Sequence, residues 1–305
     1  MTDMSDYHLQ CKLSGHTGAI YTLKAREDGR FLASGGGIGL KVWDLQEERE
    51  IDVVVVTSDV RGAITKLQWI KREDNMGEAL VYGTQSGYIT LQGKSSVRVH
   101  EIWNRQMAGS SEVTGLAFDP ATNRLAACHH GGIVQMVMLG AKMAEKEMFS
   151  LQIPCCVPGA LGFGAMHNNE RELLVSGLYC GVISDVAVDL ANSIFCVSDP
   201  STGVLLYRLN GGGELVKRFK VPVTKTWRLR QVALHDSNRA IVVGSDHGVV
   251  YVYTRRDGSL TKLVIEENEW VQTVAASDVL GVPTIFAAKS SEVSGRNDAK
   301  SNVET

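Results

Sequence analysis

Two glycine-containing stretches have residue types that could bind phosphate or activate a nucleophile. The run GGGIGL at 35–40 joins two apolar runs, and neither a helix nor a P-loop lysine follows it. In GTQSG at 83–87, Ser86 lies one position too late for a nucleophile elbow, and a strand-like run follows it. The sequence therefore favours neither phosphate binding nor serine hydrolysis at these stretches.

Two pairs of side chains have the chemistry of metal ligands or proton carriers. His129 and His130 are adjacent, so on a strand they would point to opposite faces, and a turn is the more natural place for them. Asp185 and Asp189 would lie near one face of a strand, but no histidine or glutamate accompanies them locally. Spacing therefore assembles no catalytic set and no metal site, and we expect no cofactor.

The cysteines are scattered and form no C-x-x-C pair, which excludes a zinc ribbon and a thioredoxin-like motif. We expect reduced, mostly buried thiols in the cytoplasm or nucleus, because the chain also lacks glycosylation sequons and begins with a polar segment. The adjacent pair Cys155–Cys156 is the one candidate for redox chemistry. The cysteines are Cys11, Cys128, Cys155, Cys156, Cys180 and Cys196.

Charge and hydropathy restrict the classes of partner. The 305 residues include 31 basic and 34 acidic side chains, a balance that argues against a dedicated binder of nucleic acid or of an anionic membrane. The longest apolar run, 279–288, is about half the length needed to cross a bilayer. A hydrophobic content of 44% is enough for a sizeable core.

The elements that must position these residues repeat along the chain. An apolar run, a turn containing glycine and a second apolar run recur, and most steps between successive turns are 43 to 49 residues. Such regularity predicts a tandem array of short strands. The turns lie at Gly39, Ser86–Gly87, Gly131–Gly132, Cys180–Gly181, Thr202–Gly203, His247–Gly248 and near Ser291.

One step, from Gly181 to Gly203, is only 22 residues and leaves room for two strands. Unit four would keep its first strands, 161–165 and 173–178, and lose most of its third and all of its fourth. Either this unit is truncated, or half a repeat is absent through splicing or gene prediction. We favour the second explanation, because an unpaired inner strand leaves backbone groups unsatisfied and an edge exposed.

Residues 15–44 open with Gly15–His16, close with Trp43–Asp44 and contain three apolar runs joined by two turns. On these residues the chain resembles the WD-repeat β-propeller family. The resemblance implies an all-β propeller of about seven four-stranded blades. The fourth and seventh blades are expected to be deficient, because the chain becomes polar after Ala288.

The resemblance also implies that an N-terminal strand closes the ring, and His8–Leu13 is placed to do so. We therefore expect an N-terminal segment at 1–14 with this closing strand, a propeller at 15–289 and a disordered polar tail at 290–305. The seventh unit would then lack its third strand, and the ring would close poorly.

In WD repeats a loop histidine, a turn aspartate, a strand serine or threonine and a tryptophan form a hydrogen-bonded chain. Unit one offers His16, Ser34 and Trp43, followed by Asp44, but its turn is glycine-rich and has no aspartate. Unit six offers the turn residue Asp246, without a loop histidine or a tryptophan. The member is therefore degenerate, and its apolar strands must carry most of its stability.

In a propeller, the loops entering each first strand and the turns between second and third strands meet on one rim. Arg and Trp tend to dominate interface energetics, so we predict a partner-binding site there. The alternative is a salt-bridged pair of neighbouring blades, at 216–230 and 265–270, with both tryptophans in the core. The predicted site comprises Arg61, His130, Trp227, Arg228, Arg230 and Trp270, with His129, Tyr179 and His247 on the same rim.

The sequence thus favours a non-catalytic scaffold that presents rim loops to protein partners. We expect a monomer or a subunit of a larger complex, in the cytoplasm or nucleus, that binds neither nucleic acid nor membrane. Two alternatives stay open: a metal-dependent propeller hydrolase with ligands in its channel, and a truncated product without stable function.

Overall fold

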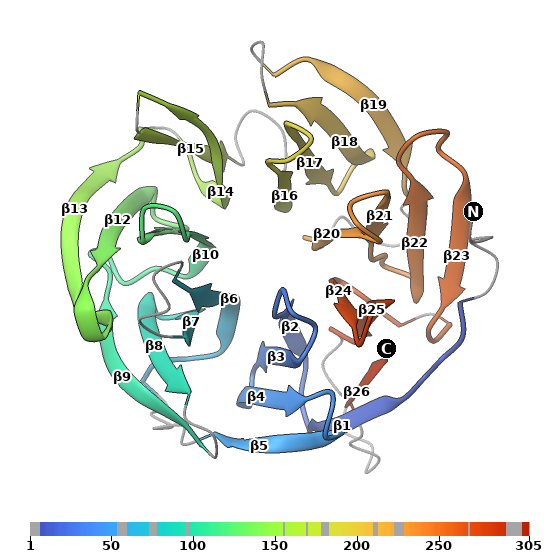
Figure 1. Cartoon of the computed structure of the whole chain (residues 1–305), viewed down its shortest axis with the longest axis horizontal. Coiled ribbons are helices and arrows are strands. Elements are labelled where there is room, and N and C mark those ends of the chain that lie inside the picture. The colour runs from blue at the N-terminus through green and yellow to red at the C-terminus, as the bar shows by residue number, and fades with distance from the viewer. Residues whose placement is uncertain are drawn as a thin grey trace.

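The computed structural model describes residues 7–53, 60–72, 78–94, 98–154, 156–168, 170–177, 183–209, 213–222, 229–267, 269–290 and 301–304. Apart from one short 3₁₀ turn, Ala141–Met143, the regular elements in these ranges are all β-strands. No helix in them is long and apolar enough to cross a membrane. Figure 1 shows the sheets standing around a common axis, so the fold is an all-β propeller.

The N-terminal part of the ring is an eight-stranded sheet made of two four-stranded meanders. A short parallel pairing joins their outermost strands, through Asp52 with Arg98 and Val53 with Val99. The first meander comprises β2 (Ile20–Ala25), β3 (Phe31–Gly36), β4 (Gly39–Asp44) and β5 (Arg49–Val53). The second comprises β6 (Ile64–Lys71), β7 (Glu78–Thr84), β8 (Tyr88–Lys94) and β9 (Arg98–Gln106).

Three further sheets are antiparallel four-stranded meanders. The first contains β10 (Val113–Asp119), β11 (Arg124–His129), β12 (Ile133–Leu139) and β13 (Glu145–Gln152). The second contains β16 (Asp185–Asp189), β17 (Ile194–Asp199), β18 (Gly203–Arg208) and β19 (Leu215–Lys220). The third contains β20 (Val232–His235), β21 (Ala240–Val243), β22 (Val249–Thr254) and β23 (Leu260–Val264).

The turns predicted at Gly39, Ser86–Gly87, Gly131–Gly132, Thr202–Gly203 and His247–Gly248 each precede the third strand of a meander, as expected. Those predicted at Cys180–Gly181 and near Ser291 lie outside the described residues.

Burial follows the position of a strand in its sheet. Every residue of β3 and β21 is buried, because these strands lie inside a sheet that packs on both faces. The outermost strands alternate or are exposed, as in β13 and β23. Apolar clusters join neighbouring sheets, for example the cluster of Cys196, Leu206 and Phe219 with Ile241 and Tyr253. The packing of adjacent sheets therefore holds the ring together.

The fourth unit has two strands in the described residues, β14 (Pro158–His167) and β15 (Glu170–Gly177), which pair only with each other. The short step in the sequence predicted this deficiency correctly.

The last sheet has four strands, and this corrects two predictions. Its order is β1 (Lys12–His16), β26 (Ser301–Glu304), β25 (Val282–Ala288) and β24 (Thr273–Val279). The prediction of a disordered tail is wrong for 301–304, and the seventh unit does not lack its third strand. Strand pairing uses backbone groups, so a polar segment can fill the position. The closing strand is Lys12–His16 and not His8–Leu13; residues 291–300 lie outside the described ranges.

Candidate functional site

The first repeat holds its histidine as the resemblance implied. His16 Nε2 lies 2.5 Å from Ser34 Oγ, and the His16 and Trp43 rings are 6.0 Å apart. Burial, helped by nearby Lys41, lowers the His16 pKa to about 4, so the imidazole is neutral at physiological pH. Asp44 accepts hydrogen bonds from the Arg30 guanidinium at 3.1 Å and from the Gln46 N–H at 3.1 Å. The side chains of His16, Ser34, Trp43 and Asp44 thus all make contacts within the first unit.

Unit six builds a different network. His247 Nδ1 lies 2.7 Å from Asp246 Oδ1, and its Nε2 lies 2.8 Å from the Tyr251 hydroxyl. Ser245 Oγ accepts the N–H of Val249 at 2.9 Å. We predicted no loop histidine in this unit, but His247, in the turn itself, contacts Asp246. The adjacency of Asp246 and His247 was the available signal.

Two arginines of the predicted rim site are bound within the fold. Arg61 donates to Glu101 at 2.6 Å, and this hydrogen bond raises the Arg61 pKa. Arg230 is 4% exposed and donates to the Asp199 carbonyl at 2.8 Å. Arg61 thus binds a carboxylate of the outermost strand β9, and Arg230 binds a backbone carbonyl at the end of β17.

The other rim residues are not brought together as one site. His129 is buried: its Nε2 lies 2.7 Å from the Ala108 carbonyl, and its Nδ1 accepts the Gly131 N–H at 2.9 Å. His130 is exposed and Trp270 is half-buried. The remaining rim residues, Tyr179, Trp227 and Arg228, lie outside the described residues. Within the described ranges, no group of three or more His, Cys, Asp or Glu side chains is arranged to hold a metal ion.

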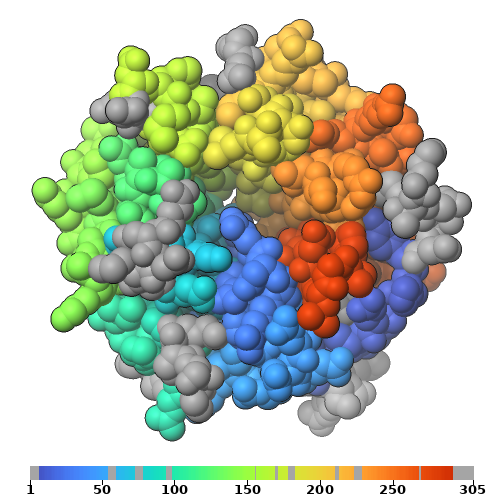
Figure 2. All heavy atoms as spheres, in the orientation of Figure 1, coloured from blue at the N-terminus to red at the C-terminus, as the bar shows by residue number. Residues whose placement is uncertain are grey.

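A channel runs along the axis of the ring and forms a cavity of about 830 Å³. Figure 2 shows one mouth of the channel at the centre of the molecule. The first strand of each unit contributes to the wall, and most wall residues are small or apolar, such as Gly115, Ala160, Ala187 and Ala233.

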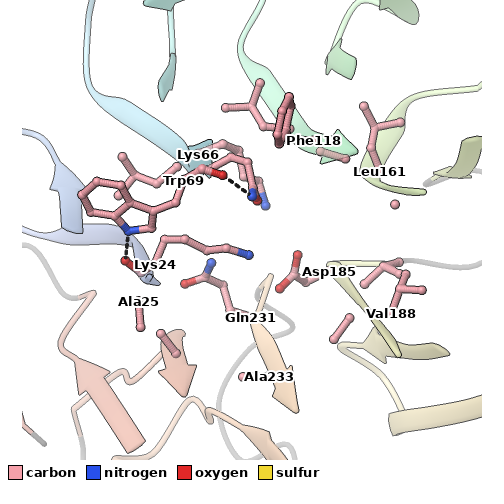
Figure 3. Close-up of a pocket in the computed structure, with 18 of the residues that line it drawn as sticks. Lys24, Ala25, Lys66, Trp69, Phe118, Leu161, Asp185, Val188, Gln231 and Ala233 are labelled. Carbon is pink, nitrogen blue, oxygen red and sulfur yellow. Dashed lines mark hydrogen bonds between the residues drawn. The ribbon is translucent and has the colours of Figure 1, made fainter. Parts of the chain in front are cut away.

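Four polar side chains meet in this channel. Figure 3 shows Lys24 (β2), Lys66 (β6), Asp185 (β16) and Gln231, just before β20, with their polar ends turned toward its middle. Asp185 Oδ2 accepts the Val232 N–H at 3.0 Å. These two hydrogen-bonded groups lie on neighbouring units, so the carboxylate is fixed in place.

Gln231 is fixed in the same way, because its Oε1 accepts the Leu23 N–H at 3.2 Å. With this oxygen engaged, the amide NH₂ group is left to donate into the channel.

The Lys24 ammonium has a lowered pKa. Burial is the main cause that lowers its pKa, and Lys66 adds to it, while Asp185 and Glu27 act in the opposite direction. The arrangement can therefore bind an anion, or hold a lysine with unusual proton affinity.

The sequence analysis missed this cluster because its members come from different repeats. Asp185 was noticed, but without a local partner. The available signal was a lysine within otherwise apolar first strands, in IYTLKA and in ITKLQW.

In a comparison with protein-family models, residues 8–44 match the model described as WD domain, G-beta repeat. This range covers β1 to β4 and includes His16, Ser34 and Trp43. A comparison with curated proteins gives no significant match.

Proposed function

We propose that this chain is a non-catalytic scaffold that binds an extended segment of a partner protein, because residues 8–44 match a WD repeat and such repeats generally mediate protein–protein interactions. The partner segment docks beside β15 and completes the two-stranded fourth sheet. The observation that carries this proposal is the outer edge of β15, which pairs with no other strand in the described residues.

An unpaired edge strand presents backbone N–H and C=O groups in the spacing that another strand requires. Both neighbouring sheets fill the corresponding positions with strands of their own chain, namely β12 and β13 on one side and β18 and β19 on the other. Only seven residues separate Gly177 from Asp185, which is too few for two further strands. We therefore assign the filling segment to another molecule.

The faces that flank this position carry apolar side chains that remain accessible. On β13, Leu151 is 57% exposed and lies opposite Val134, whose side chain packs toward β14 and β15. Since directly opposed residues share a face of the sheet, Leu151 points the same way. On the other side, Phe195 and Tyr207 stack at 5.1 Å and are half-buried. A partner strand with alternating apolar residues fits between these faces.

The rim is a second candidate surface for the same function. His130 is exposed there and Trp270 is half-buried, whereas Arg61 and Arg230 are engaged within the fold. Among the described cysteines, Cys128, Cys156 and Cys196 are free thiols, which supports placement in the cytoplasm or nucleus.

The test compares the full chain with Leu151→Lys and with a control, Leu260→Lys. Leu260 is 42% exposed on β23, the outermost strand of a complete sheet, so it matches Leu151 in chemistry and exposure. We expect a partner to bind the unmodified chain and the Leu260→Lys control with equal affinity. The same partner should bind the Leu151→Lys variant at least about tenfold more weakly.

Hydrogen exchange of the isolated complex provides the second readout. The amides of β15 should exchange more slowly in the complex than in the free chain, since a new strand pairs with them. Equal binding by all three chains, or unchanged exchange at β15, would overturn the proposal.

A further inference from the structure

We propose that the axial channel binds a small phosphate-type oxyanion between Lys24 and Lys66. This site is independent of the partner-binding edge at β15. The inference starts from the two ammonium groups, which enter the same enclosed space from neighbouring first strands (Figure 3).

Neither ammonium is neutralised within the part of the chain that the structure describes. Lys24 and Lys66 form no ion pair or side-chain hydrogen bond there; Asp185 faces them in the middle of the channel, and Glu27 also lines it. Two like charges that face the same channel repel each other. Asp185 and Glu27 act on Lys24 with the opposite sign of charge, but neither forms an ion pair with it in the described ranges, so both ammonium groups can still bind an added anion.

The neutral groups around the lysines favour an acceptor-rich ligand. The Gln231 oxygen is engaged by the Leu23 N–H, so its amide nitrogen is the atom that can donate to a ligand. Two ammonium groups and one amide provide donors from three directions, which suits a tetrahedral oxyanion. Asp185 is held in place by the Val232 N–H, and its negative charge disfavours ligands that carry many anionic groups.

The size of the channel is compatible with more than one class of phosphate compound. A volume of about 830 Å³ falls in the range of small-molecule sites and exceeds what a single phosphate fills. The wall around the lysines is made largely of small side chains such as Ala160, Ala187 and Ala233, so the body of a small solute can lie against it. Both free phosphate and a phosphate ester are therefore compatible with the chemistry.

The test is calorimetric titration of the full chain with inorganic phosphate, inorganic pyrophosphate and glycerol 3-phosphate at constant ionic strength. Lys24→Met and Lys66→Met keep most of the side-chain volume and remove the charge. Lys146→Met is the matched control, because Lys146 is exposed on the outer strand β13. We expect the parent and control to bind at least one of the anions, and each channel variant to bind it at least about tenfold more weakly.

Comparison of the probes identifies the source of the oxyanion. Tighter binding of glycerol 3-phosphate than of inorganic phosphate indicates a small organic phosphate, and the reverse order indicates the free ion. No binding of any of the three by the parent chain, or binding by both Lys24→Met and Lys66→Met that is as tight as that of the parent, overturns the proposal.

A second measurement uses the parent chain and does not depend on the folding of any variant. Acylation of lysines by an amine-reactive reagent, read by mass spectrometry, is compared with and without the tightest-binding anion. We expect the anion to reduce acylation at least about fivefold at Lys24 and Lys66 and to leave acylation of Lys146 unchanged. This change is smaller than the expected loss of affinity in the variants, because a bound anion shields the amines only while it is bound. Equal labelling with and without the anion at both channel lysines contradicts the site.

Discussion

His16 Nε2 lies 2.5 Å from Ser34 Oγ, and both side chains are buried. The contact joins the end of β1, the outer strand that closes the ring, to the middle of β3 inside the next sheet. It therefore ties ring closure to the first repeat.

This contact predicts a stability that depends on pH. The His16 pKa is lowered from 6.5 to about 4 by burial first and by Lys41 second. The unfolded chain binds a proton at higher pH than the folded chain, so stability is full above about pH 6.5 and falls as the pH drops toward 4. The loss is on the order of 3 kcal/mol. Chemical unfolding at a series of pH values measures it.

The matched variant is His16→Gln, which cannot titrate but keeps a hydrogen-bonding side chain. We expect its stability at neutral pH to be lower than that of the parent, with a flatter profile between pH 6.5 and 4. The same decline in both chains would show that other groups produce it.

The first repeat was predictable because its signals are local. Gly15–His16, the turn glycines and Trp43–Asp44 lie within one short segment, and each specifies a turn or a capped strand by its own chemistry. The missing strands of unit four were predictable for the same reason, since chain length alone limits the number of strands.

The closing sheet and the channel cluster were not predictable in this way. β26 is polar, and its pairing with β1 and β25 uses backbone groups that leave no pattern in the sequence. Lys24, Lys66 and Asp185 meet because first strands converge on the axis, and their spacing in the sequence carries no sign of this contact.

The pairing of β26 predicts that a proline in this strand destabilises the chain. Val303 pairs with Leu13 on one side and with Ala288 on the other. Proline removes the backbone N–H and is poorly tolerated inside a sheet. We expect Val303→Pro to lower Tm by roughly 3 °C, as a loss of about 2 kcal/mol would do in a chain of this size. Scanning calorimetry measures the change.

The control is Val303→Thr, which keeps the N–H group and the β-branched shape and should leave Tm nearly unchanged. If the proline variant melts with the parent, then 301–304 do not contribute a strand, as the polar composition of the tail first suggested.

Gly29 is a second position at which a substitution should destabilise the fold. It lies in the turn after β2, which meets the end of β24 in the last sheet. Its backbone has a φ of +70°, and a Cβ atom there would collide with the Asp278 carbonyl. Gly29→Ala therefore combines backbone strain with a clash, and we expect a loss of about 2–4 kcal/mol in chemical unfolding.

Two other glycines separate these causes. Gly281 has a φ of +81° with open space around it, so Gly281→Ala should cost only the strain, about 1 kcal/mol. Gly37 has neither feature, and its alanine variant should be close to neutral. Equal effects at Gly29 and Gly281 would mean that the turns do not contact each other.

The charge of Lys24 predicts how anion binding in the channel depends on pH. Three charged groups act on this ammonium: Lys66 lowers its pKa together with burial, which is the largest cause, and Asp185 and Glu27 raise it. Since the net result is a lowered pKa, Lys24 loses its proton at lower pH than an ordinary lysine. A bound anion favours the charged form of Lys24, so binding takes up protons and weakens as the pH rises through the Lys24 pKa.

Titrations with inorganic phosphate at a series of pH values above its second ionisation, in buffers of different ionisation enthalpy, measure both the uptake of protons and the loss of affinity. In Lys24→Arg the charge persists at all these pH values, and binding should stay nearly constant across them. A parent chain whose affinity is as independent of pH as that of the arginine variant would show that Lys24 does not hold the anion.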